Sequence, residues 1–192
     1  MRSRSLARAA GSPSHGRTRW VAVGAALIAL ALAWHRLAEH PGAGAPSLQP
    51  FVLRATWSPK ELYGPCRVTR VVDGDTVDVA CAGQRTRVRL LNVDTPERGQ
   101  RGFARAGAAL RKLIGDHPIF LLFETPGQPS WGRYGRLLAY LISEDGTNLN
   151  LALIAEGWSP FYRKYGDGRF PRQFARAAAE ARQQGMGLWG GR

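Results

Sequence analysis

The sequence predicts a mainly β domain of the α+β class, in which three helices pack against a small five-stranded barrel. Five runs rich in Val, Leu and Ile have the length of strands, and three amphipathic or apolar stretches have the spacing of helices. The order is three strands, a helix, two strands and two helices. Barrels of this size commonly present one face to oligonucleotides, although a fold alone does not fix a function.

The first 35 residues differ in composition from the rest of the chain. Residues 1–19 contain five arginines and no acid, and the fifteen residues 20–34 carry no charge. A bilayer span needs about 20 apolar residues, so residues 20–35 fit either a short transmembrane anchor or a cleaved signal segment. The positive flank predicts that residues 1–19 stay in the cytoplasm and that the rest is exported, to the periplasm or the extracellular space. An uncleaved membrane anchor is the preferred interpretation.

Residues 36–64 are rich in Pro, Gly, Ala and Ser without helical or strand periodicity, which predicts a flexible linker before a folded domain at 65–192. Of the 27 Lys and Arg, five precede residue 36, so the remainder has 22 against 14 Asp and Glu, a net charge of +8. This surplus favours an anionic partner such as nucleic acid, although basic surfaces can also serve solubility alone.

Cys66 and Cys81 are the two cysteines of the sequence. If Asp73 and Gly74 form the centre of a two-residue hairpin turn, residues whose numbers sum to 147 lie opposite each other, which pairs Cys66 with Cys81. Directly opposed residues come near disulfide distance, and an exported chain meets an oxidising compartment. We therefore expect a disulfide, with two small buried thiols as the alternative.

Three strands separated by short turns are expected at 67–72, 76–81 and 84–91. In the third of them Arg85, Arg87 and Arg89 alternate with Thr, Val and Leu. This period of two predicts that the three arginines share a face that meets solvent or ligand.

The later elements are expected as strands at 119–124 and 136–143 and helices at 103–114, at 148–156 and from Pro171 onward. A polar, Gly-rich loop separates the two strands at 125–135. Leu188 and Trp189 should pack back on the domain near its end.

Acidic side chains gather at the expected turns and strand ends, at Asp73, Asp75, Asp78 and Asp94. Carboxylates within a few ångströms repel unless a cation lies between them, and oxygen ligands suit a hard divalent ion. For the turn alone, hydrogen-bonding turn residues are the simpler explanation. Asp94 favours the metal site, because it follows the strand that also carries Arg89.

Arginine and glutamate side chains add what phosphodiester chemistry needs. A metal ion and arginines can share the negative oxygens of a phosphate and the charge that develops in the pentavalent state. Glu97, three residues after Asp94 and beyond a Pro, can take a proton from water or orient it. The alternative for Glu97 is an exposed loop carboxylate.

Three motifs, in order, resemble the staphylococcal (micrococcal) nuclease or thermonuclease family. They are Asp73-Gly-Asp-Thr76, Arg89-Leu-Leu-Asn-Val-Asp-Thr-Pro-Glu97 and Arg133-Tyr-Gly-Arg136. The pair Leu188-Trp189 follows them near the end of the sequence. The resemblance spans residues 67–189. It implies an OB-fold barrel with three helices and a calcium-dependent endonuclease that hydrolyses DNA and RNA with low sequence specificity, leaving 3′-phosphate ends. The loop at 98–102 departs from the family's namesake, because it is shorter and carries arginine in place of lysines.

The resemblance also implies how a cation is held. Asp75 and Asp94 look like the calcium carboxylates, and the backbone carbonyl of Thr95 looks like a further ligand. Asp73 resembles an acid that reaches the ion through water.

Catalytic and substrate-binding roles are implied in the same way. Glu97 matches the general base or water-positioning residue, and Arg89 and Arg136 match the arginines that hold the phosphate. Tyrosines beside the nucleotide are implied at Tyr134 and at one of Tyr162 and Tyr165.

The alternative is a nucleic-acid-binding barrel of the same superfamily that has lost its chemistry. Such relatives usually lack several functional residues, whereas this sequence has all five, at Asp75, Arg89, Asp94, Glu97 and Arg136. We therefore expect an enzyme that acts as a monomer, with DNA and RNA as substrates and the membrane as a further partner if the N-terminal segment is not cleaved.

Overall fold

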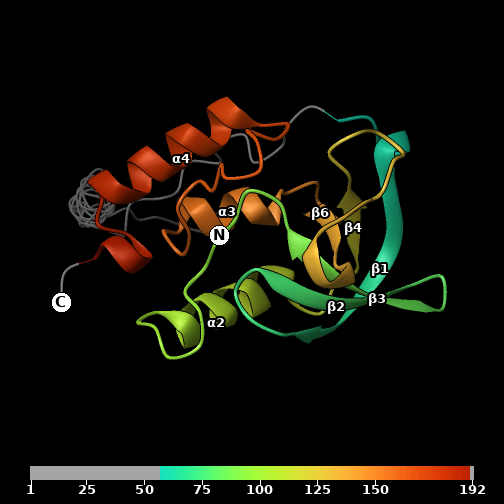
Figure 1. The fold of residues 1–192 in the computed structure, drawn as a ribbon, viewed down its shortest axis with the longest axis horizontal. Coiled ribbons are helices and arrows are strands. Elements are labelled where there is room, and N and C mark those ends of the chain that lie inside the picture. The colour runs from blue at the N-terminus through green and yellow to red at the C-terminus, as the bar shows by residue number, and fades with distance from the viewer. Residues whose placement is uncertain (1–56, 191–192) are drawn as a thin grey trace, which may run out of the picture. The chain divides into compact units, whose positions relative to one another are not determined.

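The computed structural model describes residues 57–190 (Figure 1). Their strands are β1 (Leu62–Val71), β2 (Thr76–Cys81), β3 (Gln84–Leu90), β4 (Ile119–Leu122), β5 (Ser130–Trp131) and β6 (Leu137–Ser143). Their α-helices are α2 (Phe103–Ile114), α3 (Leu149–Ala155) and α4 (Pro171–Gln183). Short 3-10 helices lie at η1 (Pro59–Glu61), η2 (Arg133–Gly135) and η3 (Gly187–Trp189). The elements follow the order that the sequence predicts.

Five of the described strands close into a barrel. The sheet order is β3-β2-β1-β4-β6-β5, and β3 also pairs with β6 in parallel, from Val88 opposite Leu137 to Leu90 opposite Ala139. This pairing joins the two ends of the series from β3 to β6, whereas β5 pairs with β6 at the rim. The predicted five-stranded OB-fold barrel with three helices is confirmed, and the two-residue β5 is an addition within the expected loop at 125–135.

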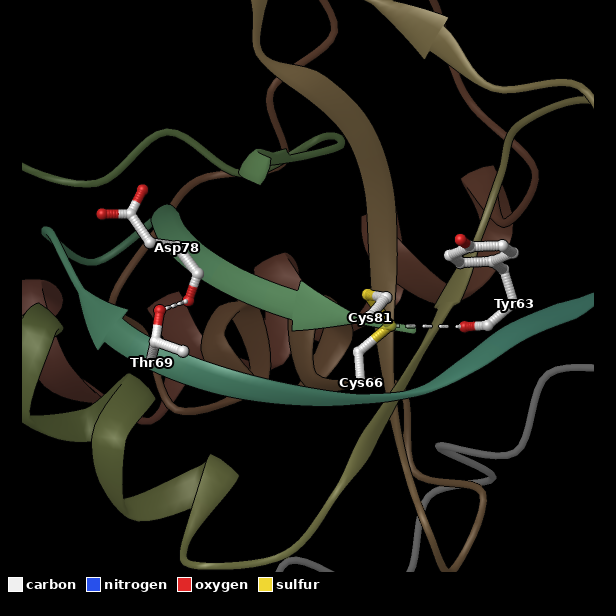
Figure 2. The surroundings of a disulfide bond; sticks show 5 residues. All are labelled: Tyr63, Cys66, Thr69, Asp78 and Cys81. Atoms are coloured by element: carbon white, nitrogen blue, oxygen red, sulfur yellow. Dashed lines mark hydrogen bonds between the residues drawn. A yellow bond between two sulfur atoms is a disulfide. The ribbon is translucent and has the colours of Figure 1, made fainter. Parts of the chain in front are cut away.

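The β1–β2 hairpin carries the predicted disulfide (Figure 2). Cys66 lies directly opposite Cys81, their Cα atoms are 4.4 Å apart, and their sulfurs are bonded. Both residues are buried in the core. The disulfide therefore ties β1 to β2 at the end of the hairpin that lies away from the turn.

The pairing near the turn differs from the prediction by one residue. Val71 pairs with Val77, so the turn is one residue wider than a two-residue turn. A β-bulge around Thr69 absorbs the extra residue, and the Thr69 hydroxyl donates a hydrogen bond to the Asp78 carbonyl at 3.1 Å. Because these two deviations cancel, the cysteines still meet.

The barrel and the helices share one hydrophobic core. The inward side chains of β2 and β3, including Val77, Val79 and Val88, are fully buried. Figure 1 shows α3 between α4 and the barrel, and α3 is buried along most of its length. The Asn148 side chain caps α3 by accepting a hydrogen bond from the Leu151 N–H at 3.1 Å.

The folded domain begins earlier than the sequence predicts. Ser58 caps η1, and Leu62 at the start of β1 pairs with Leu122 of β4. Residues 57–64, expected as the end of the flexible linker, are therefore part of the domain. The Pro and Gly residues of this segment are typical of a linker. The segment is nevertheless ordered, because it pairs with a strand some 60 residues away in the sequence.

The end of the chain packs back on the domain, as expected. The Leu188 N–H donates a hydrogen bond to the Gly157 carbonyl at 2.9 Å, and the Arg182 guanidinium lies 4.6 Å from the centre of the Trp189 ring. Within residues 57–190 no helix is both long and apolar enough for a bilayer crossing. The predicted basic region at 1–19 and the anchor or signal segment at 20–35 lie outside the described residues.

Candidate active site

The turn between β1 and β2 holds Asp75 in a buried position. The Asp73 carboxylate accepts a hydrogen bond from the Asp75 N–H at 3.0 Å, the usual way in which an aspartate fixes a turn. Asp75 is 5% exposed, and its carboxylate accepts hydrogen bonds from the Thr95 N–H, the Thr95 hydroxyl and the Thr76 hydroxyl at 2.9, 3.1 and 3.0 Å. The turn therefore locks one carboxylate against the segment that follows β3.

Arg89, on β3, joins Asp75 to Asp94. Its Nη1 lies 2.5 Å from Oδ1 of Asp75, and its Nη2 lies 3.1 Å from Oδ1 of Asp94. The side chains of Arg89 and Asp75 are only 15% and 7% exposed, whereas that of Asp94 is 44% exposed. One guanidinium thus pairs with a buried and a solvent-accessible carboxylate at the same point, and its single positive charge cannot balance both.

The environment of Asp75 opposes its ionisation. Burial raises the pKa of the Asp75 carboxyl to about 6, while the charge of Arg89 and the Thr95 N–H act in the opposite direction. The nearby Asp73 carboxylate adds to the rise in pKa. Binding of a further cation at Asp75 is therefore linked to loss of its proton.

The segment that carries Asp94 and Thr95 is held from the other side by residues that follow α3. The Asp94 N–H donates a hydrogen bond to Oγ of the fully buried Ser159 at 2.8 Å. Val93 forms an isolated β-bridge with Phe161. These contacts fix Asp94 relative to the barrel, although its carboxylate stays accessible.

Glu97 lies on the exposed loop before α2, and among the described residues it forms no ion pair with Arg89. Its N–H donates to Oε1 of Gln100 at 2.7 Å, and its carbonyl accepts from the Gln100 N–H at 2.9 Å. Among residues 57–190 no three Asp, Glu, His or Cys side chains are grouped so that they could hold a metal. The structure thus brings Asp75, Asp94 and Thr95 together and leaves Glu97 at the loop surface.

A groove of about 530 Å³ opens beside Arg89. Five of the predicted site residues line it, namely Arg89, Tyr134, Arg136, Tyr162 and Tyr165. Tyr134 and Tyr165 are 84% and 77% exposed, and the Tyr162 and Tyr165 rings meet edge to face with their centroids 5.9 Å apart. Two guanidinium groups beside accessible aromatic rings suit a phosphate and its base.

Arg136 reaches this groove from a sharp bend at η2. Tyr134 adopts a left-handed backbone with φ of 64°, and the Arg136 Nε–H donates to the Arg133 carbonyl at 3.2 Å. The Arg136 guanidinium lies 5.8 Å from the centre of the Tyr134 ring, within the range of a cation–π contact. The bend therefore presents an arginine and a tyrosine together.

Sequence reasoning missed Asn92, which ties the Arg89–Asp94 segment to the tyrosine-bearing loop. Its side-chain amide donates to the carbonyls of Tyr162 and Gly166 at 3.0 and 3.1 Å, and its Oδ1 accepts from the Tyr140 hydroxyl at 2.8 Å. Asn92 has φ of 59°, a conformation that Asn tolerates better than most residues. The sequence held one signal for this role, because Asn92 is the single polar residue in the run Leu-Leu-Asn-Val. Gly168 is required beside it, because a Cβ there would collide with Asn92 and Tyr140.

Replacing Asn92 with alanine should loosen the loop that carries Tyr162 and Tyr165. We expect KM for a short oligonucleotide to rise at least about tenfold, since three hydrogen bonds of roughly 1 kcal/mol each are lost and about 1.4 kcal/mol is a factor of ten, while kcat changes less. Steady-state kinetics and hydrogen exchange of residues 162–166 measure the effect. Tyr140→Phe removes one of the bonds to Asn92, together with the bond that the Arg169 N–H donates to the Tyr140 hydroxyl at 3.1 Å, and should give a smaller rise in KM. A fall in kcat with unchanged KM in both variants would contradict the positioning role.

Fold and site together define a small-barrel protein with a basic, aromatic groove beside two carboxylates, an arrangement suited to a phosphodiester. Residues 87–191 match the family model described as staphylococcal nuclease homologue, and the chain belongs to this family. An uncharacterized endonuclease of Escherichia coli O157:H7 is 32% identical over 124 residues, which cover 64% of this chain and 75% of the relative.

Further relatives carry nuclease names as well. The micrococcal nuclease of Shigella flexneri is 34% identical over 130 residues, covering 64% of this chain and 71% of its own. Endonuclease YhcR of Bacillus subtilis is 31% identical over 135 residues, covering 64% of this chain and 11% of its own length. The protein is therefore a nuclease, and its substrate is nucleic acid.

Proposed function

We propose that the protein is a calcium-dependent phosphodiesterase that hydrolyses DNA and RNA with low sequence specificity and leaves 3′-phosphate ends. The observation that supports this most is the double role of Arg89, which contacts Asp75 and Asp94 and also lines the groove that contains Arg136. Low sequence specificity is supported by the arginines and tyrosines of this groove, which suit phosphates and ring faces that all nucleotides share.

The residues around Asp75 fit a hard cation. Two carboxylates already converge on one positive group, and their oxygens are the donors that Ca²⁺ prefers. Asp75, Asp94 and the Thr95 carbonyl would hold the ion, with Asp73 acting through a water molecule. The bound ion would draw negative charge away from the phosphate and lower the pKa of Asp75.

The other residues act on the substrate and on water. Arg89 and Arg136 bind the phosphate oxygens, Tyr134 lies beside them, and Tyr162 or Tyr165 stacks on a base. Glu97 takes a proton from a water molecule whose oxygen bonds to phosphorus. The bond between phosphorus and the 5′ oxygen breaks, the 5′ oxygen takes up a proton from solvent, and the phosphate remains on the 3′ oxygen.

We propose further that the nuclease domain acts outside the cytoplasm as a monomer, anchored by residues 20–35 or secreted after their cleavage. The Cys66–Cys81 disulfide supports export, because disulfides persist in oxidising compartments.

A cleavage assay tests the proposed function. The purified protein should degrade single-stranded DNA and RNA in Ca²⁺, and excess EGTA should abolish both activities. Because Asp75 must lose its proton to bind the ion, the Ca²⁺ concentration for half-maximal rate should be about tenfold higher at pH 5 than at pH 7. Cleavage that persists in EGTA, or a calcium requirement that does not change with pH, would contradict the proposal.

A further inference from the structure

A second groove, of about 470 Å³, lies on the barrel outside the candidate active site. Its aromatic lining comes from β1, from the residue after β4 and from β5, as Tyr63, Phe123 and Trp131. It shares no lining residue with the groove at Arg89. We refer to it below as the Trp131 groove.

Residues that are adjacent in the sequence line the two grooves. Phe123 and Leu137 line the Trp131 groove, while their sequence neighbours Glu124 and Leu138 line the groove at Arg89. Likewise, Trp131 lines the Trp131 groove and Gly132 lines the groove at Arg89. Since successive residues of a strand point to opposite faces, Leu137 and Leu138 place the two grooves on opposite faces of β6, beside the rim strand β5. A chain that crosses the short rim strand β5 would pass from one groove to the other.

Exposed aromatic rings concentrate in these two grooves. The large apolar residues that are exposed in residues 57–190 are Tyr63, Trp131, Tyr134, Tyr165 and Trp189. Tyr134 and Tyr165 line the groove at Arg89, and Tyr63 and Trp131, which are 48% and 59% exposed, line the other. Accessible rings of this kind bind unpaired bases by stacking, without regard to base identity.

The charge of the Trp131 groove suits a phosphate backbone. Lys60 and Arg85 line it, and no carboxylate among the described residues forms an ion pair with either. Glu61 is the one acid in the lining, and Arg169 neutralises it at 3.2 Å. The groove therefore offers net positive charge beside its aromatic rings.

We propose that the Trp131 groove is a second binding site for single-stranded nucleic acid, which holds nucleotides of the strand beyond those in the groove at Arg89. A base stacks on Trp131 or Tyr63, and Arg85 and Lys60 contact the phosphates. This inference rests on the proposed action on DNA and RNA. It adds that long strands bind more tightly than short ones because they cross β5 and fill both grooves.

Fluorescence anisotropy of labelled oligonucleotides in EDTA tests the inference, since binding is then measured without cleavage. For a thymidine 12-mer we expect Trp131→Ala to raise Kd about tenfold or more, and Trp131→Phe, which keeps a ring, to change it less than threefold. Tyr63→Ala, on a different strand, should also weaken binding of the 12-mer. None of the three should change the Kd of a 3-mer, and thermal unfolding checks that each variant is folded.

A salt titration tests the charged part of the site. Arg85→Ala should reduce the slope of log Kd against log salt for the 12-mer by about 0.7, the loss of one phosphate contact on a single strand. Lys112→Ala, which removes an exposed lysine of α2, should leave the slope unchanged.

The outcomes separate this inference from the proposed function. Wild-type cleavage of DNA and RNA combined with unchanged 12-mer binding in Trp131→Ala and Tyr63→Ala would overturn the second site alone. That result is also expected if a protein segment fills the groove. If the variants instead lost the same factor of affinity for the 3-mer as for the 12-mer, the effect would lie in the groove at Arg89. This result would also overturn the second site. A wild-type protein that neither binds nor cleaves would refute both proposals.

Discussion

Arg89→Ala is expected to lower the rate of cleavage by at least about a thousandfold, because in the proposed mechanism its guanidinium contacts the phosphate as charge develops. The same change should destabilise the protein in EGTA. Asp75 would be left buried without its cationic partner, and removing one partner of a buried pair costs about 3–5 kcal/mol. Protonation of Asp75 limits this loss at low pH, so the destabilisation should be largest above pH 7. Urea unfolding at pH 8 and pH 5 measures it.

Calcium distinguishes this prediction from a general loss of packing. If Asp75 and Asp94 hold Ca²⁺, the ion should restore much of the stability of Arg89→Ala without restoring its activity. Adding Asp75→Asn to Arg89→Ala should also recover stability in EGTA, because the uncompensated charge is then absent. Arg87→Ala is the matched control, since Arg87 lies on the same strand, is half exposed and pairs with Asp78. It should lower the free energy of unfolding far less than Arg89→Ala does, because solvent screens this exposed pair. A stable, active Arg89→Ala protein would refute the role of this residue.

Glu97→Gln is expected to lower kcat by a factor of about 10²–10⁴, the usual contribution of a general base. Its stability and its affinity for an oligonucleotide in EDTA should equal those of the wild type, because the side chain is exposed and its loop is held through backbone contacts with Gln100. Single-turnover kinetics with a labelled oligonucleotide separates the chemical step from binding.

Glu124→Gln provides the control for this second prediction. Glu124 is also an exposed carboxylate, and it lines the groove at Arg89 without belonging to any motif. Its replacement should leave kcat within threefold of wild type and should strengthen binding slightly, because one like charge is removed from the phosphate path. Equal losses of kcat in the two variants would show that charge in the groove, and not proton transfer at Glu97, limits the rate.

Local sequence patterns were sufficient for most of the fold. The strand at 76–81 and the helix at 103–114 have the predicted bounds, because β-branched runs and apolar spacings of three and four are strong local signals. The start of β1 could not be found in this way. Leu62 is ordered by its pairing with Leu122, a tertiary contact that a Gly-Pro stretch does not reveal. The cysteine pairing was right because the wider turn and the bulge at Thr69 offset each other.

The candidate site shows the same limit. Motif spacing predicted a set of site residues. It did not predict that the Arg89 side chain would lie between Asp75 and Asp94, because this depends on how β3 packs beside the turn at 73–76. Asn92 was missed because its partners lie 48 to 74 residues away, and no local period links them. Contacts across the fold, and not composition, determine these positions.

The most direct test of the central claim is an anomalous-scattering map from crystals soaked with Ca²⁺ and a nucleoside 3′,5′-bisphosphate. The account predicts a calcium peak bound by the carboxylates of Asp75 and Asp94, and a phosphate that contacts Arg89 and Arg136. A map in which Arg89 still bridges the two carboxylates, with no calcium beside them and the nucleotide bound elsewhere, would contradict it.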